Sequence, residues 1–166
     1  QKVRLEISKS ICKSYGIPGI RLGILVSADE KMISDMKKDV AIWNINSFGE
    51  FYMQIEEKYK KDYALALNKL KDVRRQFVRE LSKISWIRVI PSQANYLLIE
   101  ITKGISAKEL TKILLLEYNI LIKDLSNKIL KEGKQFIRIA VRNRRENEIL
   151  VNALKKIGTG YKNTSI

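Results

Sequence analysis

The sequence of 166 residues contains no histidine, one cysteine and two prolines. Without histidine, catalytic triads that use an imidazole are excluded and a zinc site is not expected, so we predict no metal. The single cysteine, Cys12, cannot form a disulfide within the chain. No apolar run approaches the ~20 residues that a helix needs to cross a bilayer, and the first residues lack the apolar core of a signal peptide. These absences favour a cytoplasmic, globular protein.

Acidic residues are scarce beside basic ones, 18 against 32, which gives a formal net charge of +14. Such an excess invites the hypothesis of a nucleic-acid-binding domain, because basic surfaces bind phosphate backbones. However, charges of both signs alternate, as in residues 56–62, which is typical of a solvated helix face. A basic nucleic-acid-binding domain is therefore only a remote alternative, and we expect neither nucleic acid nor a membrane as a partner.

The most informative segment is residues 10–23, with the sequence SICKSYGIPGIRLG. It places a lysine, Lys13, between a hydroxyl group on Ser10 and a guanidinium on Arg21. A lysine amine can form a Schiff base with an aldehyde cofactor, and a serine and an arginine can bind the phosphate of that cofactor. Gly16 permits a positive φ and close approach of the backbone. These residue types predict pyridoxal 5′-phosphate as the cofactor.

This segment resembles the cofactor-lysine motif of fold-type I, class I/II aminotransferases, S-x-x-K-x-[FY]-G-x-x-G-x-R. It is most similar to the branch of histidinol-phosphate aminotransferase and threonine-phosphate decarboxylase. The resemblance implies that Lys13 is the Schiff-base lysine and that Ser10 and Arg21 bind the cofactor phosphate. One position departs from the motif, because Cys12 stands where serine or threonine is more usual. This departure removes the hydroxyl group of one possible phosphate contact.

Further segments resemble the small domain of the same branch, namely P-S-x-A-N-[FY] at 91–96 and [RK]-D-x-S-N at 123–127. In the last expected strand, residues 135–141, aliphatic side chains alternate with others, so Arg138 should point away from the aliphatic face. The resemblance implies that Arg138 binds the α-carboxylate of the substrate through a bidentate fork. Arg142 follows where many members have glycine, and it either contacts an acidic substrate group or is solvated.

Periodicity and turn residues predict strands at 3–8, 20–26, 86–90, 96–101 and 135–141, and helical regions at 29–38, 47–85, 106–118 and 144–157. The resemblance implies a further short strand and a turn within 119–127. With the resemblance, they imply an α/β fold in which a remnant of a large-domain sheet precedes an α+β small domain. We predict residues 1–45 to be the remnant of the large cofactor-binding domain, 46–158 the small domain and 159–166 a flexible tail. We also expect the chain to be a C-terminal piece, inactive alone, of a protein that is a homodimer when whole.

The function that the sequence predicts is transamination of an amino acid, or of a phosphorylated amino-acid-like substrate, with Lys13 as the catalytic residue. Lys13 would shuttle a proton at the substrate α-carbon, and Arg138 would orient the carboxylate, which decides which bond breaks. Decarboxylation on the same fold is an alternative that nothing in the sequence separates from transamination. A non-catalytic aminotransferase-like module is a further alternative, against which the intact residues Ser10, Lys13, Arg21 and Arg138 argue.

Overall fold

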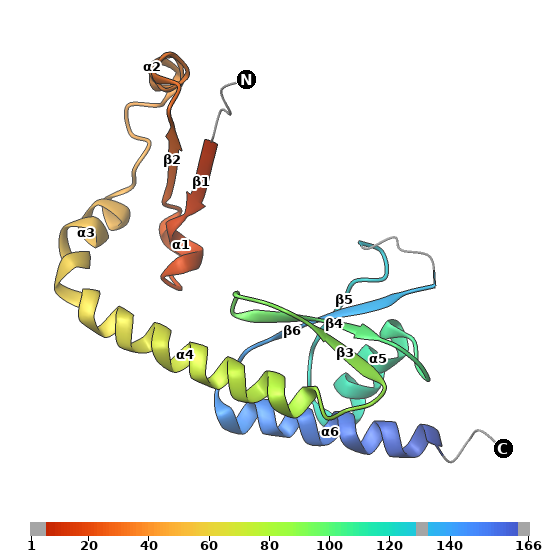
Figure 1. Cartoon of the computed structure of the whole chain (residues 1–166). Helices are drawn as coiled ribbons and strands as arrows, with labels where there is room; N and C mark the ends of the chain where they lie inside the picture. The colour runs from red at the N-terminus through yellow and green to blue at the C-terminus, as the bar shows by residue number, and fades with distance from the viewer. Residues whose placement is uncertain (1–5, 129–132, 163–166) are drawn as a thin grey trace. The chain divides into compact units, whose positions relative to one another are not determined.

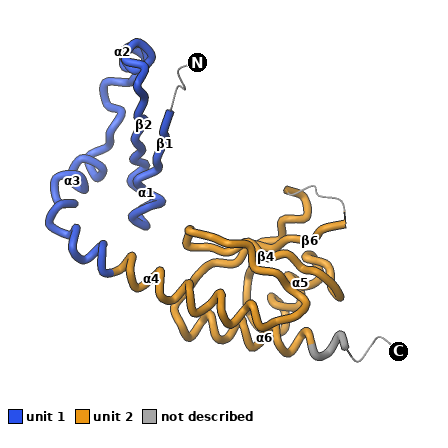
Figure 2. Tube along the Cα trace, in the orientation of Figure 1, with its two compact units in different colours: residues 1–65 blue, residues 66–166 orange. Residues whose placement is uncertain are grey.

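The computed structural model describes residues 6–128 and 133–162, with the side chains of 159–162 left aside. Helices and strands are mixed along the chain (Figure 1), which confirms the predicted α/β class. The chain divides into two compact units, residues 1–65 and 66–166 (Figure 2). The division comes later than the predicted boundary after residue 45, because Asn46 and Tyr63 contact the loop around Lys13. The domain boundary at residue 45 stays a prediction for the intact protein.

The first unit is built on a small antiparallel sheet, in which β1 pairs with β2. Its elements are β1 (Glu6–Ser10), α1 (Ile11–Ser14), η1 (Pro18–Ile20), β2 (Gly23–Ser27), α2 (Glu30–Asp39), α3 (Ser47–Ile55) and η2 (Glu56–Tyr59). The first strand was expected at 3–8, of which 3–5 lie outside the described residues, and it continues to Ser10. The second strand was expected from residue 20 but begins at Gly23, because Pro18 starts a turn of 3-10 helix.

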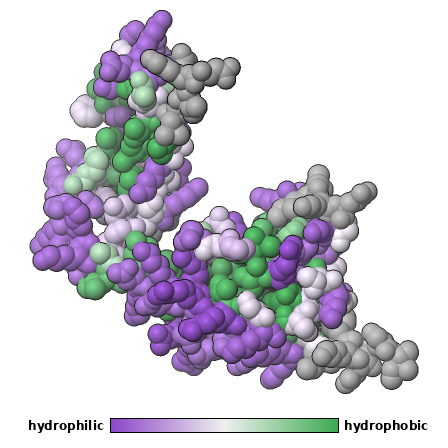
Figure 3. Space-filling model, in the orientation of Figure 1, coloured by the Kyte–Doolittle hydropathy of each residue, from purple (hydrophilic) through white to green (hydrophobic). Residues whose placement is uncertain are grey.

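Helix α4 (Lys60–Leu81) follows η2 and completes the predicted helical region 47–85, which ends four residues early. Its buried residues are Val73, Phe77 and Leu81, which recur at the three-to-four spacing of one helix face. Charged and polar residues cover much of its exposed surface, and Figure 3 shows this hydrophilic face. Burial of the apolar stripe, and not intrinsic propensity alone, therefore stabilises this long helix.

The second unit contains a four-stranded antiparallel sheet with the strand order β3-β4-β6-β5. Its strands are β3 (Ile87–Ile90), β4 (Tyr96–Ile101), β5 (Lys123–Asp124) and β6 (Gln135–Ala140), and its helices besides α4 are α5 (Ala107–Tyr118) and α6 (Arg144–Lys162). Alternate strand residues such as Leu97, Ile99 and Ile137 are fully buried in one cluster with residues of α4, α5 and α6. The helices thus cover one face of the sheet, and the other face carries the even-numbered residues of β4 and β6.

The last helix is longer than predicted, since α6 continues to Lys162 whereas 159–166 was predicted to be a flexible tail. The helix was predicted to end at residue 157, and it is longer by the residues up to Lys162. Residues 163–166 lie outside the described residues, and the flexibility of 159–166 stays a prediction. The structure explains Gly158, because a Cβ there would lie 2.1 Å from Nε1 of the buried Trp86. Glycine lets the helix pass close to the indole ring.

Candidate active site

The loop that carries Lys13 joins β1 to β2, and their register places Ser10 opposite Gly23. Ser10 therefore ends one strand and Arg21 precedes the other, so Ser10, Lys13 and Arg21 lie at the same end of the two-stranded sheet. Their side chains are exposed, and the hydroxyl of Ser10 does not cap α1. Within residues 6–128 and 133–162, neither Lys13 nor Arg21 pairs with a carboxylate. The structure brings together three groups that can bind a phosphorylated aldehyde, and leaves them free to do so.

Cys12 ties the two ends of this loop together. Its side chain is 2% exposed, and its Sγ atom accepts a hydrogen bond of 2.7 Å from the N–H of Leu22. The thiol also donates to the carbonyl oxygen of Leu22 over 3.2 Å. The sulfur thus points into the protein and satisfies both backbone groups of the residue that follows Arg21. In this position Cys12 supports the loop and does not replace the missing phosphate contact.

Arg21 has a backbone conformation that is unusual for a residue with a side chain. Its φ is +59°, in the left-handed region that non-glycine residues rarely adopt. Ile20, the residue before Arg21, is held by the N-cap residue of α3. The side-chain amide of Asn46 donates to the carbonyl oxygen of Ile20 over 2.8 Å. The same side chain caps α3 by accepting from the N–H of Gly49 at 2.9 Å. This role was not predicted from the sequence, although a residue type typical of helix caps stands directly before Ser47.

Aromatic rings hold the loop on its other side. The ring of Tyr15 stacks on that of Tyr63 with 4.3 Å between centroids, and lies edge-on to Tyr52. The hydroxyl of Tyr63 donates to the carbonyl oxygen of Ser14 over 3.2 Å, next to Lys13. Desolvation by burial, with a smaller contribution from the carboxylate of Glu56, raises the pKa of Tyr15 above its ordinary value. Tyr15 is therefore neutral near pH 7 and acts here as a packing and hydrogen-bonding group.

Arg138 lies in the second unit, at the exposed middle of β6. Ile137 and Ile139 on either side are buried, which confirms that Arg138 points away from the aliphatic face. Its guanidinium lies 5.3 Å from the centre of the Tyr96 ring, a cation–π arrangement. Lys123 of β5 pairs with Arg138 in register, so the two cations share the open face of the sheet. Like charges directly opposite each other destabilise a sheet, and an anion between them would remove that cost.

The carboxylates of Glu100 and Asp124 on the sheet bind partners other than Arg138. Glu100 of β4 is 6% exposed and forms ion pairs with Arg88 and with Lys134. These partners, Arg88 first, hold the pKa of Glu100 below its ordinary value. Asp124 accepts hydrogen bonds from the N–H and the hydroxyl of Ser126. In the part of the chain that the structure describes, no carboxylate pairs with Arg138, which leaves its fork available to a ligand.

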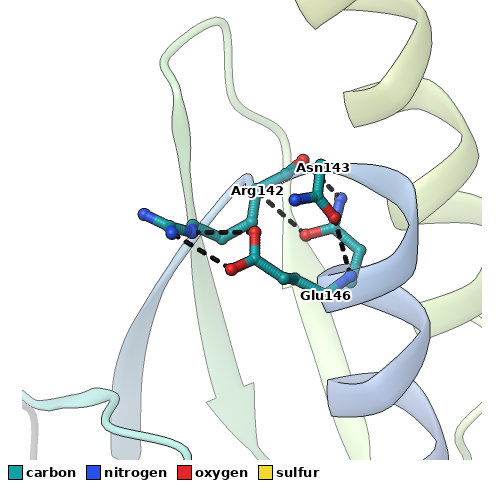
Figure 4. A network of polar contacts seen from close by, with 4 residues as sticks. Arg142, Asn143 and Glu146 are labelled. Carbon is teal, nitrogen blue, oxygen red and sulfur yellow. Dashed lines mark hydrogen bonds and ion pairs between the residues drawn. The ribbon is translucent and has the colours of Figure 1, made fainter.

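Arg142, whose role the sequence left open, forms an ion pair with the nearby Glu146. Its guanidinium pairs with the carboxylate of Glu146 through two hydrogen bonds of 3.1 and 3.2 Å (Figure 4). The backbone N–H of Arg142 donates to Asn147, and Asn143 accepts from the N–H of Glu146. These contacts close the first turn of α6, and the pairing with Arg142 lowers the pKa of Glu146. Arg142 therefore belongs to the start of this helix.

The donor set at the first unit matches pyridoxal phosphate. An amine, a hydroxyl and a guanidinium are the groups needed for its aldehyde and its phosphate dianion, and all three are exposed. Among the described residues, no cluster of acidic or cysteine side chains could hold a metal ion. Nor does any helix within the described residues contain an apolar stretch long enough to cross a membrane.

Comparisons with known proteins find relatives that match most of this chain. An L-serine phosphate decarboxylase from Sulfurospirillum multivorans is 34% identical over 160 residues, which cover 91% of this chain and 38% of that protein. A CMP-5′-(3-aminopropyl)phosphonate synthase from Streptomyces rubellomurinus is 34% identical over 152 residues, which cover 92% of this chain and 24% of that protein. The crystal structure of the histidinol-phosphate aminotransferase from Clostridium acetobutylicum matches with a TM-score of 0.83 at 29% identity, covering 93% of this chain and 46% of that one.

The chain thus spans less than half the length of each of these relatives. The family model "Aminotransferase class I and II", whose members use pyridoxal phosphate, matches residues 1–154. This match includes the Lys13 loop and the strand of Arg138, and it ends within α6. The protein therefore belongs to the class I and II aminotransferase family.

Proposed function

We propose that the intact protein is a pyridoxal-phosphate-dependent enzyme that acts on an α-amino acid carrying a phosphate group. The observation that supports the substrate class best is the pairing of Lys123 with Arg138 on the open face of the sheet. A carboxylate and a phosphate on one substrate would neutralise these two cations. A relative named for the phosphate ester of serine supports the same class, and the histidinol-phosphate aminotransferase supports the phosphate group alone.

In this proposal Lys13 holds the cofactor through its amine, and Ser10 and Arg21 bind the cofactor phosphate. When bound, pyridoxal phosphate supplies a ring that stabilises negative charge at the substrate α-carbon. Once the substrate amine has replaced that of Lys13, the freed Nζ atom would carry a proton from the substrate α-carbon to the former aldehyde carbon of the cofactor in transamination. In decarboxylation it would instead donate a proton to the α-carbon after the carboxylate has left as carbon dioxide. Arg138 holds the α-carboxylate in a two-point grip, which fixes the bond to be broken.

The proposed role of Lys13 is tested by borohydride reduction of the full-length protein with pyridoxal phosphate, followed by peptide mass mapping. We expect the cofactor on Lys13, its loss in Lys13→Ala, and its retention in Lys9→Ala, which removes an exposed lysine nearby on β1. A cofactor attached to another lysine, or to none, would contradict the proposal.

The proposed phosphate contact is tested by comparing O-phospho-L-serine with L-serine in the variant Lys123→Gln. We expect binding of O-phospho-L-serine to weaken by roughly tenfold, which corresponds to one lost charge-assisted contact, while binding of L-serine is unchanged. Arg138→Gln should instead weaken both ligands, because both carry the α-carboxylate. An equal loss for the two ligands in Lys123→Gln would argue against a phosphate at this position.

Transamination is the reaction that the sequence predicts, and decarboxylation is a second candidate, favoured by the 34% identity to an L-serine phosphate decarboxylase. Both reactions need the residues named above and differ in which bond of the α-carbon is broken. The full-length protein, incubated with O-phospho-L-serine and 2-oxoglutarate, distinguishes them. Formation of glutamate indicates transamination, whereas release of carbon dioxide with phosphoethanolamine indicates decarboxylation. A homodimer and a cytoplasmic location are part of the same proposal.

A further inference from the structure

Arg74 of α4 directs its guanidinium at the turn between β3 and β4. One terminal nitrogen donates to the carbonyl oxygens of Gln93 and Ala94, at 2.5 and 2.9 Å, and the other donates to the side-chain oxygen of Gln93 at 3.3 Å. Arg74 is half-buried, whereas the next residue, Arg75, is exposed and pairs with Asp72 on its own helix. The planar fork of arginine suits several acceptors in one plane, so Arg74 clamps this turn.

Ser92 and Asn95 of the same turn form hydrogen bonds with other partners. The hydroxyl of Ser92 donates to the carbonyl oxygen of Tyr96 at 2.7 Å and accepts from the N–H of Ala94 at 3.1 Å. The carbonyl oxygen of Asn95 accepts from the N–H of Val141, just beyond β6. Arg74 binds the two carbonyl groups in between, those of Gln93 and Ala94. Without its guanidinium these two peptide groups would lose their protein partner, and the turn would gain conformational freedom.

This turn leads directly into the residue that touches Arg138. Tyr96 begins β4, and its ring lies 5.3 Å from the guanidinium carbon of Arg138. Tyr96 pairs in register with Ala140, and Leu98 pairs with Arg138 itself. The position of the ring therefore depends on the backbone at the end of the clamped turn. A ring that moves with this backbone no longer restricts the guanidinium to one orientation.

We propose that Arg74 is a positioning residue that orients Arg138 through the turn at Gln93–Ala94 and the ring of Tyr96. The inference rests on the proposed function, in which Arg138 binds the α-carboxylate of the substrate. Arg74 itself touches no substrate. Its effect should therefore be specific to ligands that carry a carboxylate, and should vanish when Arg138 is absent.

The test uses the full-length protein loaded with pyridoxal phosphate and two ligands, O-phospho-L-serine and phosphoethanolamine. Both contain the amine and the phosphate, and only the first contains the carboxylate. Dissociation constants are measured from the change in cofactor absorbance and, independently, by calorimetry. The variants are Arg74→Met, Arg74→Lys, Arg138→Met and the double variant Arg74→Met with Arg138→Met. Arg75→Met is the matched control, since it removes an arginine from the adjacent position of the same helix.

We expect Arg74→Met to weaken O-phospho-L-serine by roughly tenfold, because small displacements of a binding group are costly. Binding of phosphoethanolamine should stay unchanged, and Arg75→Met should change neither ligand. Arg74→Lys should give a smaller loss in the same direction, and it decides the matter if Arg74→Met does not fold. In the background of Arg138→Met, the substitution of Arg74 should have no further effect.

Equal weakening of both ligands in the Arg74 variants, or an unchanged affinity for O-phospho-L-serine, would overturn the inference. So would an effect of Arg74 that persists without Arg138. In these cases Arg138→Met would still discriminate between the two ligands, and the proposed function would stand. If Arg138→Met itself fails to discriminate, the proposed function is wrong and the inference falls with it.

Discussion

The two units of the chain differ in how they are held together. The second unit buries a continuous cluster of aliphatic and aromatic residues contributed by its sheet and by α4, α5 and α6. In the described part of the first unit, residues 6–65, only Cys12 and Gly49 are buried. Apolar side chains there remain accessible, such as Val26 at 54% and Trp43 at 90% exposure, and Figure 3 shows hydrophobic surface over this unit. Exposed apolar surface of this kind is typical of sites that bind another protein, a membrane or a ligand.

The strand of Arg138 and the loop of Lys13 are therefore held by different kinds of contact. The second unit places Arg138 on a sheet whose reverse side is a packed core, so its backbone is fixed by burial. The first unit places Lys13 on a loop that is held by single polar and aromatic contacts, from Cys12, Asn46 and Tyr63. Contacts of that kind contribute about 1 kcal/mol each, far less than a core. The loop with Lys13 should therefore be easier to perturb than the strand with Arg138.

The largest expected effect comes from a comparison of two leucines in strands, one in each unit. Leu97 of β4 is 0% exposed, whereas Leu25 of β2 is 39% exposed. Leu97→Ala should lower the free energy of unfolding of the second unit by about 2–5 kcal/mol, because it leaves a cavity in a packed core. Leu25→Ala should cost less than about 1 kcal/mol in the first unit. Native-state amide exchange of peptides from β4 and β2 measures both, and similar losses would contradict the comparison.

A second prediction tests how closely the core of the second unit is packed. Gly158→Ala should destabilise this unit by about 1–3 kcal/mol, despite the higher helix propensity of alanine, because of overpacking. The added methyl group would lie 2.1 Å from Nε1 of Trp86, which is buried. Urea unfolding, followed by the fluorescence of Trp86 in a Trp43→Phe background, measures this change in the free energy of unfolding. Asn152→Ala, at an exposed position of the same helix, is the control and should change stability by less than about 0.5 kcal/mol.

A third prediction concerns the polar contacts of the first unit. Asn46→Ala removes the cap of α3 and the hydrogen bond to Ile20 next to Arg21. The loss of such a cap costs about 0.5–2 kcal/mol. We expect amide exchange to accelerate in the peptide 11–23, and exchange in the second unit to stay unchanged. Asn44→Ala, two residues earlier and exposed, should leave both regions unchanged. Unaltered exchange around Arg21 would show that Asn46 does not hold the loop.

The smallest effect is a dependence of stability on pH that belongs to the second unit. Hydrogen bonds from Arg88 and then from Lys134 lower the pKa of Glu100 in the folded state. A lowered pKa contributes stability that is fully present above the unfolded value, about 4.3, and is lost as the pH falls through the lower folded value. The urea midpoint of the second unit should therefore fall on acidification below about pH 4.3, and fall less in Glu100→Gln.

Two comparisons complete this experiment. Glu117→Gln, at an exposed position of α5, should keep the full pH dependence of the wild-type protein. Other carboxyl groups whose pKa is lowered, those of Glu80, Asp124 and Glu146, also lie in the second unit, so some dependence remains in Glu100→Gln. If Glu100→Gln and the wild-type protein lose stability in parallel, the ion pairs of Glu100 do not contribute in this range.

Much of the fold and of the candidate site could be predicted from the sequence, wherever a local pattern decides the structure. The alternation of β6 placed Arg138 opposite the aliphatic face, and the apolar spacing of α4 identified its buried side. Prediction failed where distant residues decide. The second strand begins late because of the turn at Pro18, and α6 continues past Gly158 because that glycine passes Trp86. Neither the clamp of Arg74 on the turn at Gln93 nor the register of Lys123 with Arg138 has a local signature.

The sequence by itself predicted the family of this protein and its cofactor, because a lysine between a serine and an arginine at fixed spacing offers groups suited to a phosphorylated aldehyde. It also determined most of the helices and strands, since their periodicity is local. Only the tertiary structure decided which arginine side chains form ion pairs with carboxylates and which do not. Arg142 is paired with Glu146 and Arg88 with Glu100, whereas Arg138 contacts the ring of Tyr96 and pairs with no carboxylate of the described residues. Pairing depends on strand register and on helix ends that meet in space, and these are set by packing between segments far apart in the chain.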